Sequence, residues 1–190
     1  TVNTVTPLAD GRLSGESTDG PGFLRALRDA GHEVRGATAL VLGAGGAARA
    51  VAHALGAAGA RVTVCARRDD AARVAAVLGH GATVAWGERA AAAAAATVVV
   101  NATPVGMGDG SRDAPLPVEA LHQGQVVADL VYHPLETALL AGARERGADV
   151  VDGLGMLVHQ AALQVERWTG EVAPVAVMRA AAIGVLRPAR

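Results

Sequence analysis

Residues 38–50 read Thr-Ala-Leu-Val-Leu-Gly-Ala-Gly-Gly-Ala-Ala-Arg-Ala, an apolar run of five residues that ends in a glycine cluster. An alanine-rich pattern continues to Ala58, so the stretch predicts a strand over 38–42, a tight turn, and a helix over 46–58. Glycines spaced G-x-G-x-x-G between a strand and a helix are typical of turns that bind the phosphates of a dinucleotide. The stretch therefore predicts a phosphate-binding turn.

The three positions of the fingerprint are Gly43, Gly45 and Ala48, with alanine at the place where the helix packs on the strand. Gly43 allows the sharp turn, and Gly45 lets a pyrophosphate approach without meeting a Cβ. The first N–H groups of the helix supply donors. A glycine-rich turn also arises by chance in an alanine-rich chain, but the flanking strand and helix favour binding. We assign the phosphate contacts to Gly43, Ala44, Gly45, Gly46 and Ala47.

The next predicted strand, 61–66, ends at Arg67 and Arg68. An acid about 20 residues after the glycine turn would bind the ribose 2′-hydroxyl of NAD, whereas arginine accommodates the 2′-phosphate of NADP. Guanidinium groups match a phosphate bidentately. Asp69 and Asp70 follow directly, and they are the argument for NAD or for a solvated ion pair. The pattern favours NADP.

The composition is that of a soluble globular protein with one substantial core, with 51% hydrophobic and 18% charged residues among 190. The net charge of −1 has no long run of one sign, which argues against nucleic acid or an anionic membrane as a partner. A single cysteine, Cys65, excludes an internal disulfide and a zinc site of cysteines. We expect a cytoplasmic monomer or homodimer that binds a small-molecule substrate and no metal.

The chain starts at Thr1 inside a strand-like segment, and its 17 basic residues include no lysine. We therefore expect that a segment preceding Thr1 is missing from this sequence. Residues 2–13 predict a hairpin. A helix with Phe23 on its apolar face follows and ends near Gly31, with Thr18 or Asp19 as its N-cap.

From residue 38 onward, strands alternate with helices, which predicts an α/β fold with a doubly wound parallel sheet of the Rossmann type. The predicted strands are 38–42, 61–66, 97–100, 125–129 and 148–151, with a short apolar stretch at 82–86, and the predicted helices are 46–58, 69–79, 88–95 and 135–146. The carboxyl ends of such strands meet where open α/β sheets bind ligands. They carry Gly43, Arg67, Asn101, Thr103, Asp129 and Tyr132.

Six motifs follow one another in register: Val2-Asn3-Thr4, Gly15-x-x-Thr18-Asp19-Gly20, Gly43-Ala44-Gly45-Gly46-Ala47, Asn101-Ala102-Thr103-x-Val105-Gly106-Met107, Asp129-x-x-Tyr132-x-Pro134-x-x-Thr137, and Gly153-x-x-Met156-Leu157-x-x-Gln160. In this order they resemble the motifs of the shikimate dehydrogenase family. The resemblance extends over the whole chain, without the amino-terminal substrate domain of that family.

The resemblance implies an NADP-dependent enzyme that reversibly reduces 3-dehydroshikimate to shikimate in aromatic amino-acid biosynthesis. It implies that Asn3, Tyr132 and Gln160 bind the substrate, and that Asp19 contacts the substrate as one half of a Lys/Asp catalytic pair. Since the family's lysine lies in the amino-terminal domain, the chain alone is expected to be inactive. Further cofactor contacts are implied at Asn101, Thr103, Val105, Gly106, Met107, Leu130, Gly153 and Met156.

The same resemblance divides the chain into a remnant of the substrate domain at 1–14, an interdomain helix at 15–37, the NADP-binding domain at 38–170, and a carboxyl-terminal helix at 171–190 that packs back toward the amino-terminal segment. Two departures from the family concern Ser17, where asparagine is common, and Ala66, where an Asn-Arg pair commonly begins. The second departure affects the contacts to the adenosine ribose and the strength of the NADP preference.

Each implied site residue has a structural alternative: Asp19 as a helix cap, Gln160 as an exposed helix residue, Tyr132 as a packing aromatic and Asn101 as a turn former. Their common register favours the functional interpretation. Methylenetetrahydrofolate dehydrogenase shares the architecture but does not need Asn3, Asp19 and Gln160. Two classes of function stay open: a dehydrogenase acting on shikimate or quinate, and a non-catalytic NADP-binding module.

Overall fold

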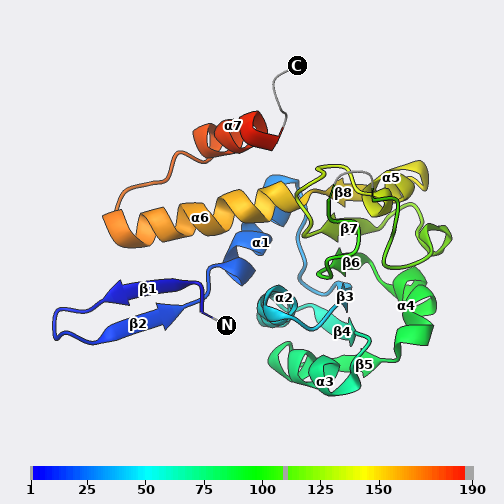
Figure 1. Cartoon of the computed structure of the whole chain (residues 1–190). Coiled ribbons are helices and arrows are strands. Elements are labelled where there is room, and N and C mark those ends of the chain that lie inside the picture. Colours follow the sequence, from blue (N-terminus) through cyan, green and yellow to red (C-terminus); the bar gives the residue numbers. More distant parts are fainter. Residues whose placement is uncertain (1, 109–110, 187–190) are drawn as a thin grey trace.

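The structure is a computed structural model that describes residues 2–108 and 111–186. Its centre is a six-stranded parallel sheet with the strand order β5-β4-β3-β6-β7-β8 (Figure 1). The chain reverses its direction of progress across the sheet between β3 and β6, which is the Rossmann arrangement and confirms the predicted fold class. The strands are β3 (Thr38–Leu42), β4 (Arg61–Cys65), β5 (Ala82–Val84), β6 (Val98–Asn101), β7 (Val126–Asp129) and β8 (Asp149–Val151).

Helices cover both faces of the sheet, so its central strands are buried on both sides. The helices are α1 (Asp19–Asp29), α2 (Gly46–Ala57), α3 (Asp69–Leu78), α4 (Arg89–Ala95), α5 (Ala138–Glu145), α6 (Gly153–Thr169) and α7 (Val175–Leu186). In β3, Val41 belongs to the apolar cluster under α1, α2 and α3, whereas Leu40 and Leu42 belong to the cluster under α4 and α5. This two-sided burial explains why the strand is a continuous apolar run.

Two predicted helices begin later than expected. The helix predicted over 135–146 starts at Ala138, because the Thr137 hydroxyl accepts a hydrogen bond from the Leu140 N–H and so caps it. The helix predicted over 88–95 is preceded by a short 3-10 turn, η1 (Trp86–Glu88), and runs over Arg89–Ala95. A second such turn, η2 (Val118–Ala120), precedes β7.

The amino-terminal hairpin is present but extends beyond the predicted range of 2–13, since β1 (Thr4–Pro7) pairs antiparallel with β2 (Leu13–Glu16). It projects from the body of the molecule beside α6 (Figure 1). The Trp168 indole N–H donates to the carbonyl of Val5 at 3.2 Å, and Arg167 pairs with Glu16, so two side chains of α6 hold it. The hairpin is therefore attached to the helix rather than to the sheet.

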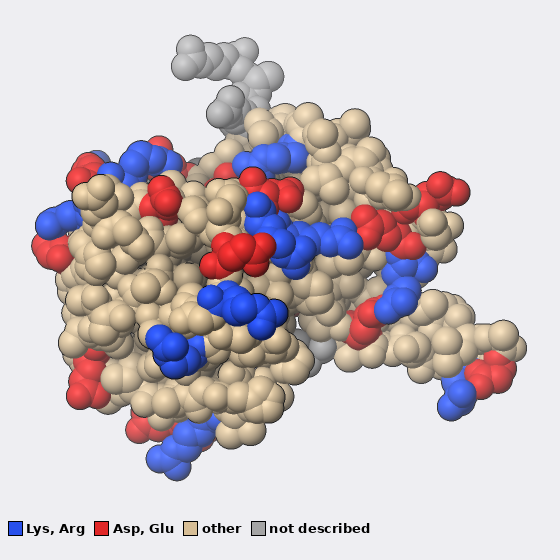
Figure 2. Space-filling model, turned by 180° about the vertical axis from the view of Figure 1, so that it is seen from behind, with Lys and Arg blue, Asp and Glu red and all other residues tan. Residues whose placement is uncertain are grey.

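Helix α7 packs on α6, with an ion pair of 2.8 Å between Arg179 and Asp152, and none of its described residues is buried. Acidic and arginine side chains are interspersed over the face shown in Figure 2. Among the described residues, no helix is both long and apolar enough to span a bilayer.

We expect Gly56→Ala to destabilise the fold. A Cβ at Gly56 of α2 would lie 2.2 Å from the carbonyl oxygen of Gly79, a backbone atom that cannot move cheaply. The loss in the free energy of unfolding should be about 1–3 kcal/mol. Gly184→Ala in α7 is the control, because a Cβ there meets nothing within 4 Å. Urea unfolding followed by circular dichroism measures both variants, and equal stabilities would contradict the close approach of α2 to the turn at Gly79.

Candidate functional site

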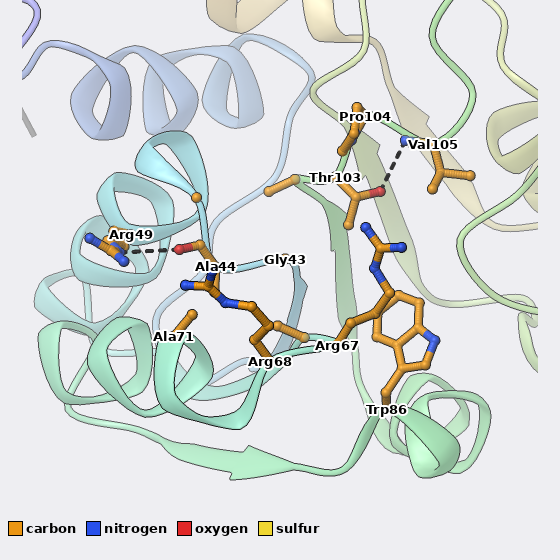
Figure 3. Close-up of a pocket in the computed structure, with 13 residues that line it drawn as sticks. Gly43, Ala44, Arg49, Arg67, Arg68, Ala71, Trp86, Thr103, Pro104 and Val105 are labelled. Carbon is orange, nitrogen blue, oxygen red and sulfur yellow. Dashed lines mark hydrogen bonds between the residues drawn. The ribbon is translucent and has the colours of Figure 1, made fainter.

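A cavity of about 480 Å³ lies at the carboxyl ends of β3, β4 and β6, where the order of the strands reverses (Figure 3). Open α/β sheets bind ligands at this point. The walls come from the loops that follow these strands, from the starts of α2 and α3, and from η1. The lining residues are Gly43, Ala44, Gly45, Arg49, Ala66, Arg67, Arg68, Ala71, Trp86, Ala102, Thr103, Pro104 and Val105.

The two fingerprint glycines serve different purposes. Gly43 has a φ of +110°, and a Cβ there would lie 2.7 Å from the carbonyl oxygen of Ala102, so the fold itself requires glycine. A Cβ at Gly45 would meet no protein atom within 4 Å. Gly45 is also the N-cap of α2 and offers no side chain to the first N–H groups of the helix, at Gly46 and Ala47. Space and donors are therefore both available to an anion.

Three guanidinium groups line the cavity. In Figure 3, Arg49 and Arg68 lie on either side of Ala44, whereas Arg67 extends toward Thr103 and Trp86. The Arg49 Nε–H donates to the Ala44 carbonyl at 3.1 Å, which braces the glycine turn. Arg68 contacts Asp70 at 3.7 Å, but both side chains are at least 75% exposed, so this pair is weak.

Asn101 does not line the cavity, although the sequence assigned it to the cofactor. Its side chain is fully buried; Nδ2 donates to Asp129 Oδ1 at 2.9 Å and to the Val105 carbonyl at 3.1 Å. Its Oδ1 accepts from the Thr103 N–H at 3.0 Å and from the Thr103 hydroxyl at 2.7 Å. All four hydrogen-bonding positions are filled by protein. Asn101 thus positions Thr103 and Val105, which do line the cavity.

Asp129 anchors this network from the neighbouring strand. Its buried carboxylate accepts from Asn101, from the Val131 N–H at 3.0 Å and from the Thr137 hydroxyl at 2.7 Å. Burial raises its pKa from 3.8 to about 6, and these three bonds oppose the rise. The carboxylate joins the loops after β6 and β7 to the start of α5.

The other residues that the sequence assigned to the cofactor lie along the loops after β6, β7 and β8. A Cβ at Gly153 would lie 2.6 Å from the Leu130 carbonyl oxygen, so this glycine allows α6 to start against the loop after β7. Met156 belongs to the apolar core and is 9% exposed, whereas Met107 is 58% exposed. Gly106 has a φ of +93°. Among the described residues, the cavity wall does not include Gly106, Met107, Leu130, Gly153 or Met156.

A second polar cluster brings together three residues that the sequence assigned to the substrate. The Asn3 amide lies 2.8 Å from Asp19 Oδ1 and 3.3 Å from Gln160 Oε1. Its Oδ1 accepts from the Thr18 N–H at 2.9 Å. The residues come from the start of the chain, from α1 and from α6, which cross closely at Gly22. Tyr132, in the loop after β7, is 41% exposed and forms none of these bonds.

Arg49 and Trp86 are cavity residues that the sequence analysis did not assign. Arg49 lies four residues after Gly45, and its N–H donates to the Gly45 carbonyl, so helical spacing alone returns it to the glycine turn. Trp86 follows β5, and its place at the cavity depends on how β5 pairs with β4. The four-residue spacing in a predicted helix could have placed Arg49 beside the glycine turn. No neighbouring residue in the sequence indicates that Trp86 lies at the cavity.

The sheet order, the glycine turn and the cavity at the reversal point define a Rossmann-type dinucleotide-binding fold. A family model described as the Shikimate 5′-dehydrogenase C-terminal domain matches residues 153–183. The shikimate dehydrogenase (NADP(+)) of Moorella thermoacetica is 47% identical over 187 residues, which cover 93% of this chain and 63% of that protein. The chain thus spans a little under two thirds of the length of this curated relative.

Two solved structures are similar over nearly the whole chain. The shikimate 5-dehydrogenase of Thermus thermophilus in complex with NADP(H) and shikimate is 43% identical with a TM-score of 0.85, over 96% of this chain and 67% of that one. The quinate dehydrogenase of Corynebacterium glutamicum in complex with NAD is 32% identical with a TM-score of 0.89, over 96% of this chain and 67% of that one. The chain belongs to the shikimate dehydrogenase family.

Asp129→Asn tests whether burial or hydrogen bonding has the larger effect on the pKa of the Asp129 carboxyl group. Because its folded-state pKa of about 6 exceeds its ordinary value of 3.8, the ionised group costs stability at neutral pH, and the cost is relieved as the pH falls through about 6. Between pH 7 and pH 5, the free energy of unfolding of the unmutated chain should rise by about 1 kcal/mol relative to that of the variant. Urea unfolding at both pH values measures this, and an unchanged or falling difference would mean that the three hydrogen bonds outweigh burial.

Proposed function

We propose that this chain supplies the cofactor site and one wall of the substrate site of an NADP-dependent shikimate dehydrogenase, which reversibly reduces 3-dehydroshikimate to shikimate. The observation that carries the proposal is the presence, in a chain of this family, of both the cavity with three arginines and the cluster of Asn3, Asp19 and Gln160. The Thermus thermophilus relative, whose structure contains NADP(H) and shikimate, supports it.

In this proposal, the pyrophosphate of the cofactor lies against Gly45 and the first N–H groups of α2. Arg67 and Arg68 hold the 2′-phosphate, and Arg49 adds positive charge beside the glycine turn. The nicotinamide half extends along the loop that begins at Thr103 and toward the start of α6. When bound, NADPH supplies the hydride, and the chain's own residues orient it.

Asp19 and its neighbours would serve the substrate. Reduction of a ketone needs a proton donor at the developing alkoxide, and an ammonium beside a carboxylate can give that proton. The sequence contains no lysine, and arginine holds its proton too tightly for this role. We propose that the lysine partner of Asp19 comes from outside these 190 residues, that Asn3, Gln160 and Tyr132 contact the substrate, and that the enzyme is a cytoplasmic monomer or homodimer.

Gly45→Val should abolish binding of NADP⁺ while the chain stays folded. The new side chain has room in the protein and an allowed backbone conformation, with φ −72° and ψ −170°, but it fills the space proposed for the pyrophosphate. Gly43→Val is the contrast, because its strained φ and its clash with Ala102 should unfold the turn. Titration calorimetry and circular dichroism separate the two effects, and normal binding by Gly45→Val would place the pyrophosphate elsewhere.

Arg67→Ala and Arg68→Ala should each weaken binding of NADP⁺ by on the order of 1.5–3 kcal/mol, because a charge-assisted phosphate contact is lost. Binding of NAD⁺, which lacks the 2′-phosphate, should change much less. Arg73→Ala is the control, since Arg73 is exposed on α3 outside the described cavity wall. Equal affinity of the unmutated chain for NADP⁺ and NAD⁺ would contradict the assignment to NADP.

The 190-residue chain should not oxidise shikimate or quinate, whereas a protein extended upstream of Thr1 with a lysine-bearing segment should do so. Proton transfer from a positioned side chain is worth about 10²–10⁴-fold in rate. In the extended protein, Asp19→Asn should lower kcat strongly and leave NADP⁺ binding nearly unchanged, with Glu145→Gln, an exposed carboxylate at the end of α5, as the control.

NADPH production from each of the two substrates measures the rates. Appreciable turnover by the 190-residue chain would overturn the proposal that a lysine from outside these residues transfers the proton. An extended protein that is inactive on shikimate and on quinate but binds NADP⁺ would favour a non-catalytic NADP-binding module.

A further inference from the structure

Among the described residues that line the cavity, one has an aromatic side chain, and it is Trp86. The chain has only four Phe, Trp and Tyr residues, and the other three lie elsewhere. Phe23 is buried in the core, Tyr132 follows β7, and the Trp168 indole bonds to the hairpin. A single aromatic ring thus stands at the side of the cavity formed by β4 and β5.

The ring of Trp86 is held in place by Arg89 and by the apolar core. The Arg89 guanidinium lies 4.7 Å from the centre of the ring, over its face. Arg89 is itself fixed, because its Nε–H donates to the Pro115 carbonyl at 2.9 Å and its Nη1 donates to the Trp86 carbonyl at 2.8 Å. Trp86 also packs against the apolar cluster under α4 and α5. These contacts leave the indole part-exposed and oriented at the cavity.

Trp86 shares its side of the cavity with Arg67, whose side chain extends toward it from the end of β4 (Figure 3). Ala66, the other residue here, presents only a methyl group. The described lining residues at this end of the cavity therefore offer an aromatic surface and a guanidinium. Arg67 also extends toward Thr103. The Thr103 hydroxyl is already bonded to Asn101 Oδ1 and to the Val105 N–H. The cavity, of about 480 Å³, lies within the usual range of ligand pockets, about 300–1,000 Å³.

We propose that Trp86 is the stacking surface for the adenine of the nucleotide, with Arg67 at the same end. The inference rests on the proposed NADP binding and deepens it. The 2′-phosphate and the base belong to the same ribose, so a phosphate held by Arg67 or Arg68 brings the adenine to the end of the cavity where Trp86 stands. Stacking on an aromatic ring suits a base that meets few hydrogen-bonding groups.

Calorimetric titration of the 190-residue chain with NADP⁺, 2′,5′-ADP and nicotinamide mononucleotide tests the proposal. Trp86→Leu keeps an apolar side chain but removes the ring, and it should weaken NADP⁺ and 2′,5′-ADP about tenfold. Trp86→Phe keeps an aromatic face and should retain affinity to within about threefold. The mononucleotide, which has no adenine, should bind all variants equally. Trp168→Leu is the matched control, since it removes the other indole without touching the cavity.

Fluorescence gives a second readout. In Trp168→Phe, Trp86 is the sole indole, and 2′,5′-ADP should quench its emission, whereas the emission of Trp168 in Trp86→Phe should not respond. Unchanged affinity of Trp86→Leu for NADP⁺, or an equal loss for the mononucleotide, would overturn the stacking role. Failure of the unmutated chain to bind NADP⁺ would instead overturn the proposed function, and the inference with it.

Discussion

The site depends on the close approach of two loops, after β3 and after β6, at the carboxyl edge of the sheet. Gly43 stands where a Cβ would lie 2.7 Å from the Ala102 carbonyl oxygen, and its N–H donates to the Cys65 carbonyl at 2.8 Å. The turn is therefore held between the ends of two neighbouring strands, β4 and β6. Because that contact fixes the turn, the first N–H groups of α2 already face the cavity before a ligand binds. The phosphate-binding turn is therefore preorganised.

The buried polar network of Asn101 and Asp129 extends this constraint across the sheet. Each polar atom of the Asn101 side chain is satisfied by protein, so its bonds shape the loop that carries Thr103 and Val105. Satisfied buried networks fix one conformation, and partly satisfied ones are costly. The motif around Asn101 thus serves the cavity wall through its backbone rather than through its own side chain.

The strands, the glycine turn and the hairpin could be predicted because each is specified by neighbouring residues. The roles of individual side chains that the sequence left undecided depend on residues that are distant in the chain. The alternative of Asn101 as a turn former matches its contacts, which involve a carboxylate 28 residues away. Trp86 reaches the cavity only through the pairing of β5 with β4. Helix α6 was not assigned, although Asp152 caps it and Gly170 ends it with a φ of +74°, because its residues were interpreted as motif positions rather than as a helical repeat.

In the second polar cluster, the Asp19 carboxylate has one hydrogen-bond donor among the described residues, the Asn3 amide. The Asn3 amide has two hydrogens, yet Thr18 Oγ1, Asp19 Oδ1 and Gln160 Oε1 all lie within 3.3 Å of its nitrogen. Gln160 Oε1 also accepts from the Gln164 amide at 3.2 Å, whereas among the described residues the Asp19 carboxylate accepts a hydrogen bond from Asn3 alone. The carboxylate of Asp19 therefore keeps unused acceptor capacity at a partly exposed position. Such a cluster favours partners that donate hydrogen bonds, and hydroxyl groups and an ammonium are both donors, which is the chemistry that the proposed substrate and the proposed lysine share.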